Sequence, residues 1–283
     1  MNASREQRAE GLKEFNFTVR DFERVRSLIY KRAGIALAPG KQEMVYSRLA
    51  RRLRSVGIRS FEQYLDSLER DSDSAEWEAF TNALTTNLTS FFREEHHFPI
   101  LADHVRNRRD VNVWCSAAST GEEPYSIAMT LCETYGTLTP PAQILATDID
   151  TNVLATAAAG IYPAERIERL SPERLRRFFL RGTGAQAGLV RVRPELRRLI
   201  TFQQLNLLDE SYRMSSPFDV VFCRNVMIYF DKPTQGRVLS RFAPLIKPDG
   251  LLFAGHSENF LYVSDRFKLR AKTVYQLATA RAT

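Results

Sequence analysis

The stretch VNVWCSAASTGEEPYSIAMTLCETYG, residues 111–136, joins three local patterns that decide the fold. Its first six residues form an apolar run with valine and tryptophan, typical of a buried strand. The loop that follows has one glycine and two adjacent glutamates, and from Pro124 the sequence has helical composition and ends on a glycine. A strand, a short loop and a helix in this order predict the first unit of an α/β protein.

Strands and helices continue to alternate after this unit. We predict helices at PYSIAMTLCETYG, NVLATAAAG and KPTQGRVLSRFAPLI, and strands at VNVWCS, QILATD, LITFQQL, FDVVFC, GLLFAGH and FKLRAKTVYQLA. This alternation predicts a mostly parallel, doubly wound, Rossmann-like sheet. Such a sheet binds ligands beyond the carboxyl ends of its strands, where the strand order reverses.

The loop at residues 116–123 differs from a dinucleotide-binding loop, which has several glycines where the backbone approaches a pyrophosphate. Glu122 and Glu123 occupy the expected phosphate position, and a phosphate oxygen about 4 Å from one carboxylate is repelled by roughly 4 kcal/mol. A nucleoside with positive charge fits better, and S-adenosylmethionine has both a sulfonium and an ammonium group. The alternative is that the two glutamates only complement the helix dipole.

Polar residues follow four successive predicted strands. Glu123 follows the first strand, Asp148 ends the second, Asn206 follows the third, and Arg224 with Asn225 follows the fourth. A carboxylate at the second position is suited to ribose hydroxyls, and an amide at the third is suited to the edge of adenine. These residues predict one crevice at the carboxyl edge of the sheet.

The chain of 283 residues is long enough for two domains. Residues 1–85 have helical patterns and cap signals, such as Thr18 with Asp21, and we predict a separate helical domain there. Residues 86–283 form the α/β domain. Between about 160 and 198 an insertion contains a helix and an alternating segment, GLVRVR, which predicts a small antiparallel β-subdomain.

The net charge of +7 favours acidic partners. In the predicted helical segment QEMVYSRLARRLRSVG, residues 42–57, an apolar stripe is formed by Val45, Leu49, Leu53 and Val56. The rest of the segment carries four arginines, Arg48, Arg51, Arg52 and Arg54. This basic face predicts a protein contact, and the alternative is a solvated surface. Three cysteines, Cys115, Cys132 and Cys223, lie in apolar runs and are expected to be reduced, and without an apolar span we expect a cytoplasmic protein.

Five motifs in order, NALTTNLTSFFRE, SAASTGEEPYSIA, ATDID, FCRNVMIYF and IKPDGLLFAGHSENF, resemble the chemotaxis receptor glutamate methyltransferases, the CheR family. The resemblance extends from about residue 17 to the end of the chain. It implies a class I methyltransferase fold and transfer of a methyl group from S-adenosylmethionine to receptor glutamates, giving γ-methyl esters and S-adenosylhomocysteine. It also implies a monomer that is recruited to membrane receptor arrays.

The resemblance further implies roles for individual residues. Cofactor contacts are implied for Asn87, Thr89, Arg93, Glu123, Asp148, Asn206, Leu207, Arg224 and Asn225. Arg93 and Tyr229 are expected nearest the chemistry. Receptor contacts are implied for the basic helix and for the β-subdomain around Gly188, Val190 and Val192, which in the family grips a peptide at the receptor's carboxyl terminus.

Methyl transfer to a carboxylate needs no strong general base, because a glutamate side chain is ionised at pH 7. No metal site is expected, since the adjacent residues His96 and His97 would face apart on a helix. Two other functions stay open from the residues alone. One is a nucleic-acid methyltransferase, although RNVMIY lacks the prolines of an amino-methylating turn, and the other is a non-catalytic receptor-binding cofactor sensor.

Overall fold

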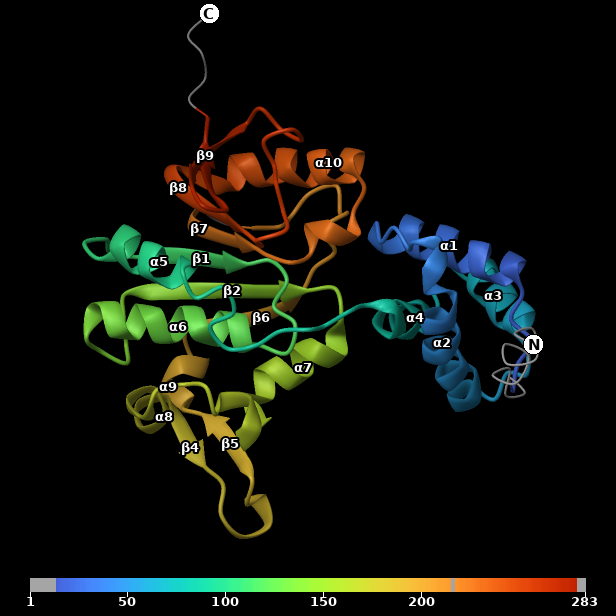
Figure 1. Cartoon of the computed structure of the whole chain (residues 1–283), viewed down its shortest axis with the longest axis horizontal. Helices are drawn as coiled ribbons and strands as arrows, with labels where there is room; N and C mark the ends of the chain where they lie inside the picture. The colour runs from blue at the N-terminus through green and yellow to red at the C-terminus, as the bar shows by residue number, and fades with distance from the viewer. Residues whose placement is uncertain (1–13, 215–216, 279–283) are drawn as a thin grey trace, which may run out of the picture. The chain divides into compact units, whose positions relative to one another are not determined.

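The computed structural model describes residues 14–214 and 217–278. The chain divides into two compact units, Met1–Thr85 and Thr86–Thr283 (Figure 1). Among the described residues, no helix has both the length and the apolar character that crossing a bilayer requires.

The first unit is helical and contains α1 (Val19–Ala33), η2 (Pro39–Lys41), α2 (Gln42–Val56), α3 (Phe61–Arg70) and α4 (Glu76–Leu84). Its helix ends follow the predicted cap signals. Thr18 and Asp21 form a capping box at the start of α1, and Ser60 accepts a hydrogen bond from the backbone N–H of Gln63 at the start of α3. Gly34 ends α1 with a positive φ of 71°.

Helix α2 buries a stripe of side chains, Val45, Leu49, Ala50 and Leu53. The stripe is one turn shorter than predicted, because Val56 is 36% exposed at the end of the helix. Arg52 forms an ion pair with Glu76 of α4, and Tyr64 of α3 donates to the same carboxylate at 2.7 Å. This network joins three helices of the unit through one half-buried acidic group.

The second unit is built on a seven-stranded sheet with the order β6-β2-β1-β7-β8-β10-β9. The five strands from β6 to β8 run parallel, and β10 runs antiparallel to both of its neighbours, β8 and β9. The strands are β1 (Val111–Cys115), β2 (Ala142–Asp148), β6 (Ile200–Gln204), β7 (Phe218–Cys223), β8 (Ile246–Ala254), β9 (Phe267–Ala271) and β10 (Val274–Leu277). The predicted doubly wound sheet of a class I methyltransferase is therefore confirmed, with the order reversing between β1 and β7.

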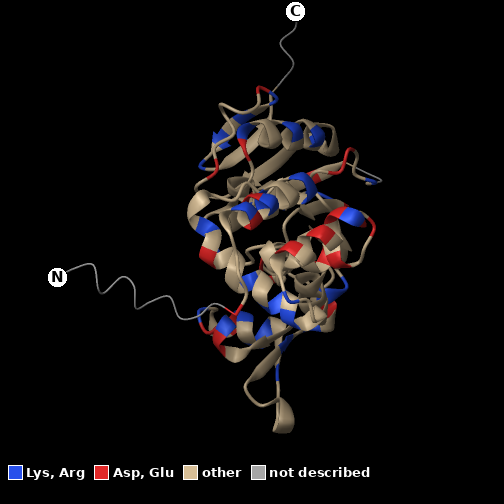
Figure 2. Ribbon diagram, turned by 90° about the vertical axis from the view of Figure 1, so that its right-hand side faces the viewer, with Lys and Arg blue, Asp and Glu red and all other residues tan. Residues whose placement is uncertain are grey.

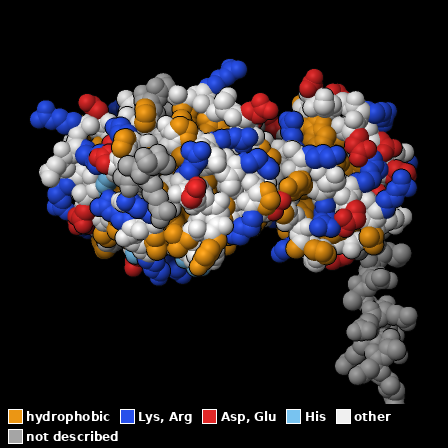
Figure 3. All heavy atoms as spheres, turned by 90° about the horizontal axis from the view of Figure 1, so that it is seen from above, with side chains coloured by type: hydrophobic (Ala, Val, Ile, Leu, Met, Phe, Trp, Pro, Cys, Tyr) orange, Lys and Arg blue, Asp and Glu red, His pale blue; other side chains and the backbone are white. Residues whose placement is uncertain are grey.

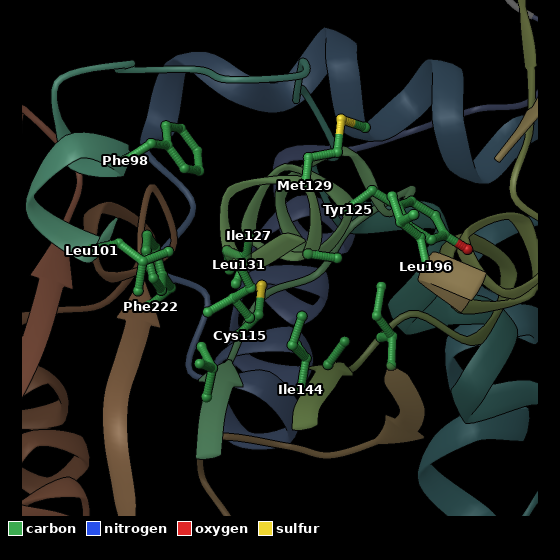
Figure 4. Close-up of a cluster of buried hydrophobic side chains, with 14 of the residues drawn as sticks. Phe98, Leu101, Cys115, Tyr125, Ile127, Met129, Leu131, Ile144, Leu196 and Phe222 are labelled. Atoms are coloured by element: carbon green, nitrogen blue, oxygen red, sulfur yellow. The ribbon is translucent and has the colours of Figure 1, made fainter. Parts of the chain in front are cut away.

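The sheet buries alternate residues against different layers. Cys115 of β1 and Phe222 of β7 pack in a cluster with α5 (His97–Val105) and α6 (Glu122–Tyr135), as Figure 4 shows. Trp114 and Val221 belong to a second cluster, which contains residues of α10 (Lys232–Phe242). Because neighbouring residues of a strand point to opposite faces, this alternation places helices on both sides of the sheet. The remaining helix beside the parallel strands is α7 (Thr151–Ala159).

One predicted strand is wrong. We predicted FKLRAKTVYQLA as a single strand, but it forms the antiparallel pair β9 and β10. The chain reverses at Lys272 and Thr273, and Thr273 has a positive φ of 55°. The segment has none of the glycine, asparagine or proline signals that usually mark a tight turn, so its sequence gave no reason to divide it.

The insertion forms a separate three-stranded antiparallel sheet, with the order β3-β5-β4, as predicted. Its strands are β3 (Ile161–Pro163), β4 (Phe179–Arg181) and β5 (Leu189–Val192). Short helices complete it: η3 (Ala164–Ile167), α8 (Pro172–Phe178), η4 (Gly184–Gln186) and α9 (Pro194–Arg197). The connection from β4 to β5, residues 182–188, carries no charged residue (Figure 2).

Candidate active site

The loop between β1 and α6 is fixed by a glycine at its end. Gly121 has a φ of 100°, and a Cβ there would lie 2.7 Å from the hydroxyl of Tyr162 and 2.8 Å from the Cβ of Ala157. The Tyr162 hydroxyl donates to the carbonyl of Thr120 at 2.7 Å. Any other residue at 121 therefore requires both backbone strain and displacement of its neighbours.

The two glutamates after this glycine do not form the doubly negative site that we predicted. The carboxylate of Glu122 is fully buried and accepts hydrogen bonds from Arg166 at 2.6 Å and from Thr120 at 2.6 Å. The carboxylate of Glu123 accepts from Arg224 at 2.5 Å and from the Cys115 thiol at 3.3 Å. Because each carboxylate is paired with a guanidinium group, the repulsion of phosphate estimated from the sequence does not apply in that form.

Arg224 joins three segments of the crevice. Its guanidinium group pairs with Glu123, lies 3.4 Å from a carboxylate oxygen of Glu94, and donates to the backbone carbonyl of Arg93. Burial raises the pKa of Glu123, and the charge of Arg224 opposes this shift. For Glu94, burial alone would raise the pKa, but hydrogen bonds from His256 and the charge of Arg224 lower it to about 2. Glu94 is therefore ionised at neutral pH.

The turn after β7 is organised by a second carboxylate that the sequence analysis did not identify. Glu258 is 6% exposed and accepts hydrogen bonds from the backbone N–H groups of Asn225, Met227, Ile228 and Gly255, at 2.6 to 3.3 Å. Asn225 is held at a positive φ of 58°, and its side chain donates to Glu94 at 3.2 Å. Its short polar side chain tolerates this conformation better than most residues do. Glu258 therefore fixes the shape of the segment that carries Asn225 and Tyr229.

We expect Glu258→Gln to destabilise the protein by about 1–3 kcal/mol, because the amide nitrogen replaces an acceptor that faces backbone donors. Urea unfolding of the full chain measures this change. Glu210→Gln is the matched control, because Glu210 is exposed in the β6 to β7 connection. Equal stability of the two variants would contradict the assigned role.

A second group of contacts surrounds the end of β2. The carboxylate of Asp148 is 8% exposed and accepts from the backbone N–H groups of Ser119 at 2.8 Å and Asp150 at 3.0 Å. Burial raises the pKa of Asp148, and these backbone hydrogen bonds oppose that shift. Asn87 donates to Asp150 at 2.8 Å, and its carbonyl accepts from the Ser119 hydroxyl at 3.1 Å. The segment before α5 is thus joined to both the first loop and the second strand.

The other predicted cofactor residues lie near these groups or on neighbouring segments. Leu205, which precedes Asn206, donates its N–H to the carbonyl of Asp148 at 3.0 Å. The Asn206 side chain accepts from the N–H of Leu208 at 2.9 Å, and Leu207 is buried. Thr89 is half-buried in the same segment as Asn87.

The two residues expected nearest the chemistry have different settings. Arg93 is half-buried, and its guanidinium group donates to the carbonyl of Leu88 at 2.8 Å, within its own segment. Tyr229 is half-buried in η5 (Met227–Tyr229) and packs against the hydrophobic cluster that contains α10 residues. Among the contacts between described residues, none brings these two side chains together.

Our expectation that His96 and His97 face apart is wrong. Residues 91–96 form turns, and α5 begins only at His97. The two imidazole rings lie 4.2 Å apart between centroids, and Glu94 is close to both. The helical spacing rule does not apply before the first helical residue. Burial lowers the pKa of His97 to about 3.

Two family models match the chain, and together they cover most of it. Residues 87–276 match the model described as "CheR methyltransferase, SAM binding domain". Residues 20–85 match the model described as "CheR methyltransferase, all-alpha domain".

Curated relatives align with this chain over most of both lengths. The chain is 58% identical to "Chemotaxis protein methyltransferase" of Escherichia coli over 91% of this chain and 90% of the relative. It is 61% identical to the protein of that name from Klebsiella aerogenes, over 90% and 89%. "Chemotaxis protein methyltransferase 2" of Pseudomonas aeruginosa is 52% identical over 95% and 96%.

Proposed function

Because this chain belongs to the CheR family of S-adenosylmethionine-dependent chemotaxis methyltransferases, we propose that it esterifies glutamate side chains of chemotaxis receptors at the crevice described above. Arg224 is the main support for placing the reaction in this crevice. Its guanidinium group donates to the Glu123 carboxylate and to the backbone carbonyl of Arg93. These contacts join the ends of β1 and β7 at the point where the strand order reverses.

The residues at this edge fit S-adenosylmethionine. The Nε–H of Arg224 is buried and has no hydrogen-bond partner among the described residues, and the carboxylate of the cofactor is a suitable acceptor. The backbone donors from Ser119 and Asp150 orient Asp148 and leave lone pairs on both of its oxygens for ribose hydroxyls. We assign the remaining cofactor contacts to Asn87, Thr89, Arg93, Glu123, Asn206, Leu207 and Asn225.

The chemistry needs positioning more than proton transfer. When bound, S-adenosylmethionine supplies an electrophilic methyl group on a sulfonium centre. The receptor glutamate is ionised at neutral pH, with an ordinary pKa of about 4.3, so the chain needs no general base. Its residues have to orient one carboxylate oxygen and limit water. We assign this orientation to Tyr229, and to Arg93 the binding of a cofactor or substrate carboxylate.

Transfer of a radiolabelled methyl group to receptor cytoplasmic domains, followed by its release as methanol in base, tests this function. Base-labile label on the receptor supports a glutamate ester. Label on nucleic acid would support the nucleic-acid alternative, and cofactor binding without transfer would support the sensor alternative. Basic side chains are spread over the visible face of each unit rather than gathered in one patch, which argues against an extended nucleic-acid surface on that face (Figure 3).

We propose that the exposed arginines of α2 contact the receptor. Arg51 and Arg54 are exposed, and Arg54 forms an exposed ion pair with Glu14 at 3.2 Å. Arg52 pairs with Glu76. Arg48 donates to the carbonyls of Leu84 and Thr85 at 3.0 and 2.6 Å. Arg48 and Arg52 thus stabilise their own unit, so replacing either one would also affect folding.

We expect the double variant Arg51→Ala/Arg54→Ala to reduce receptor methylation several-fold at low salt, because two attractive charges are lost. Its affinity for S-adenosylhomocysteine, measured by calorimetry, should equal that of the unchanged protein. The matched control is Arg20→Ala/Arg70→Ala, which removes two exposed arginines from α1 and α3. Equal methylation by both double variants would mean that the α2 face is only solvated.

We further propose that the β-subdomain binds the receptor's carboxyl-terminal peptide at the edge of β4. Val190 and Val192 are buried on the central strand β5, so they support the sheet from inside, while Gly188 lies in the exposed connection before β5. The β3 edge contains Pro163, which has no N–H to donate. The edge of β4 has no proline, and Leu180 is 40% exposed beside it. An extended peptide could add there as a fourth strand.

We expect Arg181→Pro to weaken binding of a receptor tail peptide at least about 10-fold, because it removes one donor from the β4 edge. Gly182 donates to the carbonyl of Leu189 in β5, and the carbonyl of Phe178 accepts from Arg193 just after β5. The alternation of an antiparallel ladder therefore turns the backbone groups of Arg181 outward. Arg181→Ala is the matched control, since it removes the same side chain and keeps the N–H. Direct titration with fluorescent peptide measures both, and equal affinities would exclude this edge.

We also propose that the protein acts as a monomer in the cytoplasm and is recruited to receptor arrays by these two surfaces. Sedimentation of the protein alone and with receptor tail peptide tests the oligomeric state. Microscopy of a fluorescent fusion in cells with tail-deleted receptors tests the recruitment.

A further inference from the structure

Glu94, His96 and His97 bring electron-pair donors together in a cluster in which His97 is buried and the other two residues are half-buried. One potential ligand atom from each residue lies within 4.8 Å of the others. Each residue also has a buried polar atom without a hydrogen-bond partner among the described residues, namely Glu94 Oε2, His96 Nε2 and His97 Nδ1. The His97 side chain is fully buried. Glu94 Oε2 has an ion-pair contact with Arg224 at 3.4 Å but no hydrogen bond. Buried polar atoms without a hydrogen bond are uncommon in folded proteins, so a cluster of three calls for a ligand.

The tautomer of His97 follows from its other ring nitrogen. The Thr273 hydroxyl donates its proton to the carbonyl of Lys272 at 2.8 Å. Its oxygen lies 2.8 Å from His97 Nε2, and with the hydroxyl proton on that carbonyl we assign Nε2–H as the donor in this contact. The Nδ1 atom of neutral His97 therefore has a free lone pair. It lies 3.9 Å from Glu94 Oε2, which is also an acceptor, so these two atoms cannot hydrogen-bond to each other.

We propose that Glu94, His96 and His97 bind a divalent transition-metal ion, with Zn²⁺ as the best match for two imidazoles and one carboxylate. Three protein ligands leave one position for water, as in tetrahedral zinc sites. A metal-bound histidine usually donates its other ring N–H to an acceptor that orients the ring, and the Thr273 oxygen has this role for His97 Nε2. This site does not depend on the proposed function for its support, but Glu94 also contacts Arg224 and Asn225 of the crevice.

The charges and the position of the cluster are compatible with a cation. Glu94 and Glu123 face one guanidinium group, Arg224, so these three groups have a net charge of −1. Arg224 lies 3.4 Å from Glu94 Oε2 and reduces the attraction without cancelling it. His96 lines a cleft of about 660 Å³ with Phe92, Glu95 and Arg174, so the cluster borders this cleft through His96. A bound ion would hold the turn whose Arg93 carbonyl accepts from Arg224.

Zinc titration of the metal-free full chain, in competition with a chromogenic chelator, tests the proposal. We expect one Zn²⁺ per chain. His96→Ala should weaken binding at least about 100-fold, and Thr273→Val about 10-fold, because valine keeps the shape but cannot accept from Nε2–H. His104→Ala is the matched control, since His104 also has a buried unpartnered Nε2 but is not part of the cluster. It should bind zinc as the unchanged protein does.

Three results would overturn the proposal: no stoichiometric binding by the unchanged protein, equal affinity in His96→Ala, or an equal loss in His104→Ala. Absence of binding would mean that water bridges Glu94 and His97. A spectroscopic measurement on the unchanged protein tests the site without relying on variants that could misfold. Co²⁺ added to the metal-free chain should give the intense visible absorption of a four-coordinate site, and a weak six-coordinate spectrum would count against it.

Discussion

Replacing Arg224 with methionine will lower the free energy of unfolding by about 3–5 kcal/mol, because it leaves a buried carboxylate without its partner. Arg224 is 4% exposed and Glu123 is 9% exposed, and the two form a direct ion pair at 2.5 Å. The same change removes the donor to the Arg93 carbonyl. Urea unfolding of the full chain measures the loss, and the affinity for S-adenosylhomocysteine should fall with it.

A double variant shows whether the stability is lost because a buried charge is unpaired or because the side chain at position 224 has a different shape. Glu123→Gln combined with Arg224→Met removes both charges, and most of the lost stability should return while cofactor affinity stays low. Arg106→Met is the matched control, because Arg106 forms an ion pair with Asp103 in which both side chains are more than 60% exposed. Its stability should hardly change. If the single Arg224 variant were as stable as this control, the pair would have no structural role.

Replacing Asp148 with alanine will weaken the binding of S-adenosylhomocysteine about 100-fold, because two hydrogen bonds from ribose to a charged acceptor are lost. The backbone N–H groups of Ser119 and Asp150 already fix this carboxylate toward the crevice edge. Calorimetric titration measures the affinity.

The control for Asp148 is Asp249→Ala, which removes a carboxylate that pairs with Arg108 and lies outside the crevice. Its affinity for S-adenosylhomocysteine should be unchanged. Thermal unfolding of both variants is needed as well, because Asp148 accepts from two backbone donors and its loss also affects the loop. Unchanged affinity in a folded Asp148→Ala variant would refute the ribose assignment.

Patterns within single segments predicted much of the fold. The capping residues Thr18 and Ser60, the apolar strands and the alternating insertion are all marked by residue patterns that extend over a few positions. Polar residues at the strand ends were predicted to meet because parallel strands end at one edge. The hairpin at Lys272 and Thr273 was missed, since no residue there has a strong turn preference.

The candidate site was predicted less completely. Glu94 and Glu258 were missed because a single acidic residue after a polar run or a strand carries no periodic signal. Their roles depend on which backbone donors and side chains the fold brings to them. A lone glutamate two residues after the strand end of GLLFAGH was the available clue to Glu258.

The sequence by itself determined the order of strands and helices, the boundary signals and the identity of the strand-end residues, because these depend on local spacing. Only the tertiary structure decided the charge of the crevice. Glu122 pairs with an arginine 44 positions away, Glu123 with one 101 positions away, and Glu94 accepts from residues 131 and 162 positions away. Electrostatic energy depends on distance in space, so partners this remote along the chain cannot be read from the loop that contains the glutamates.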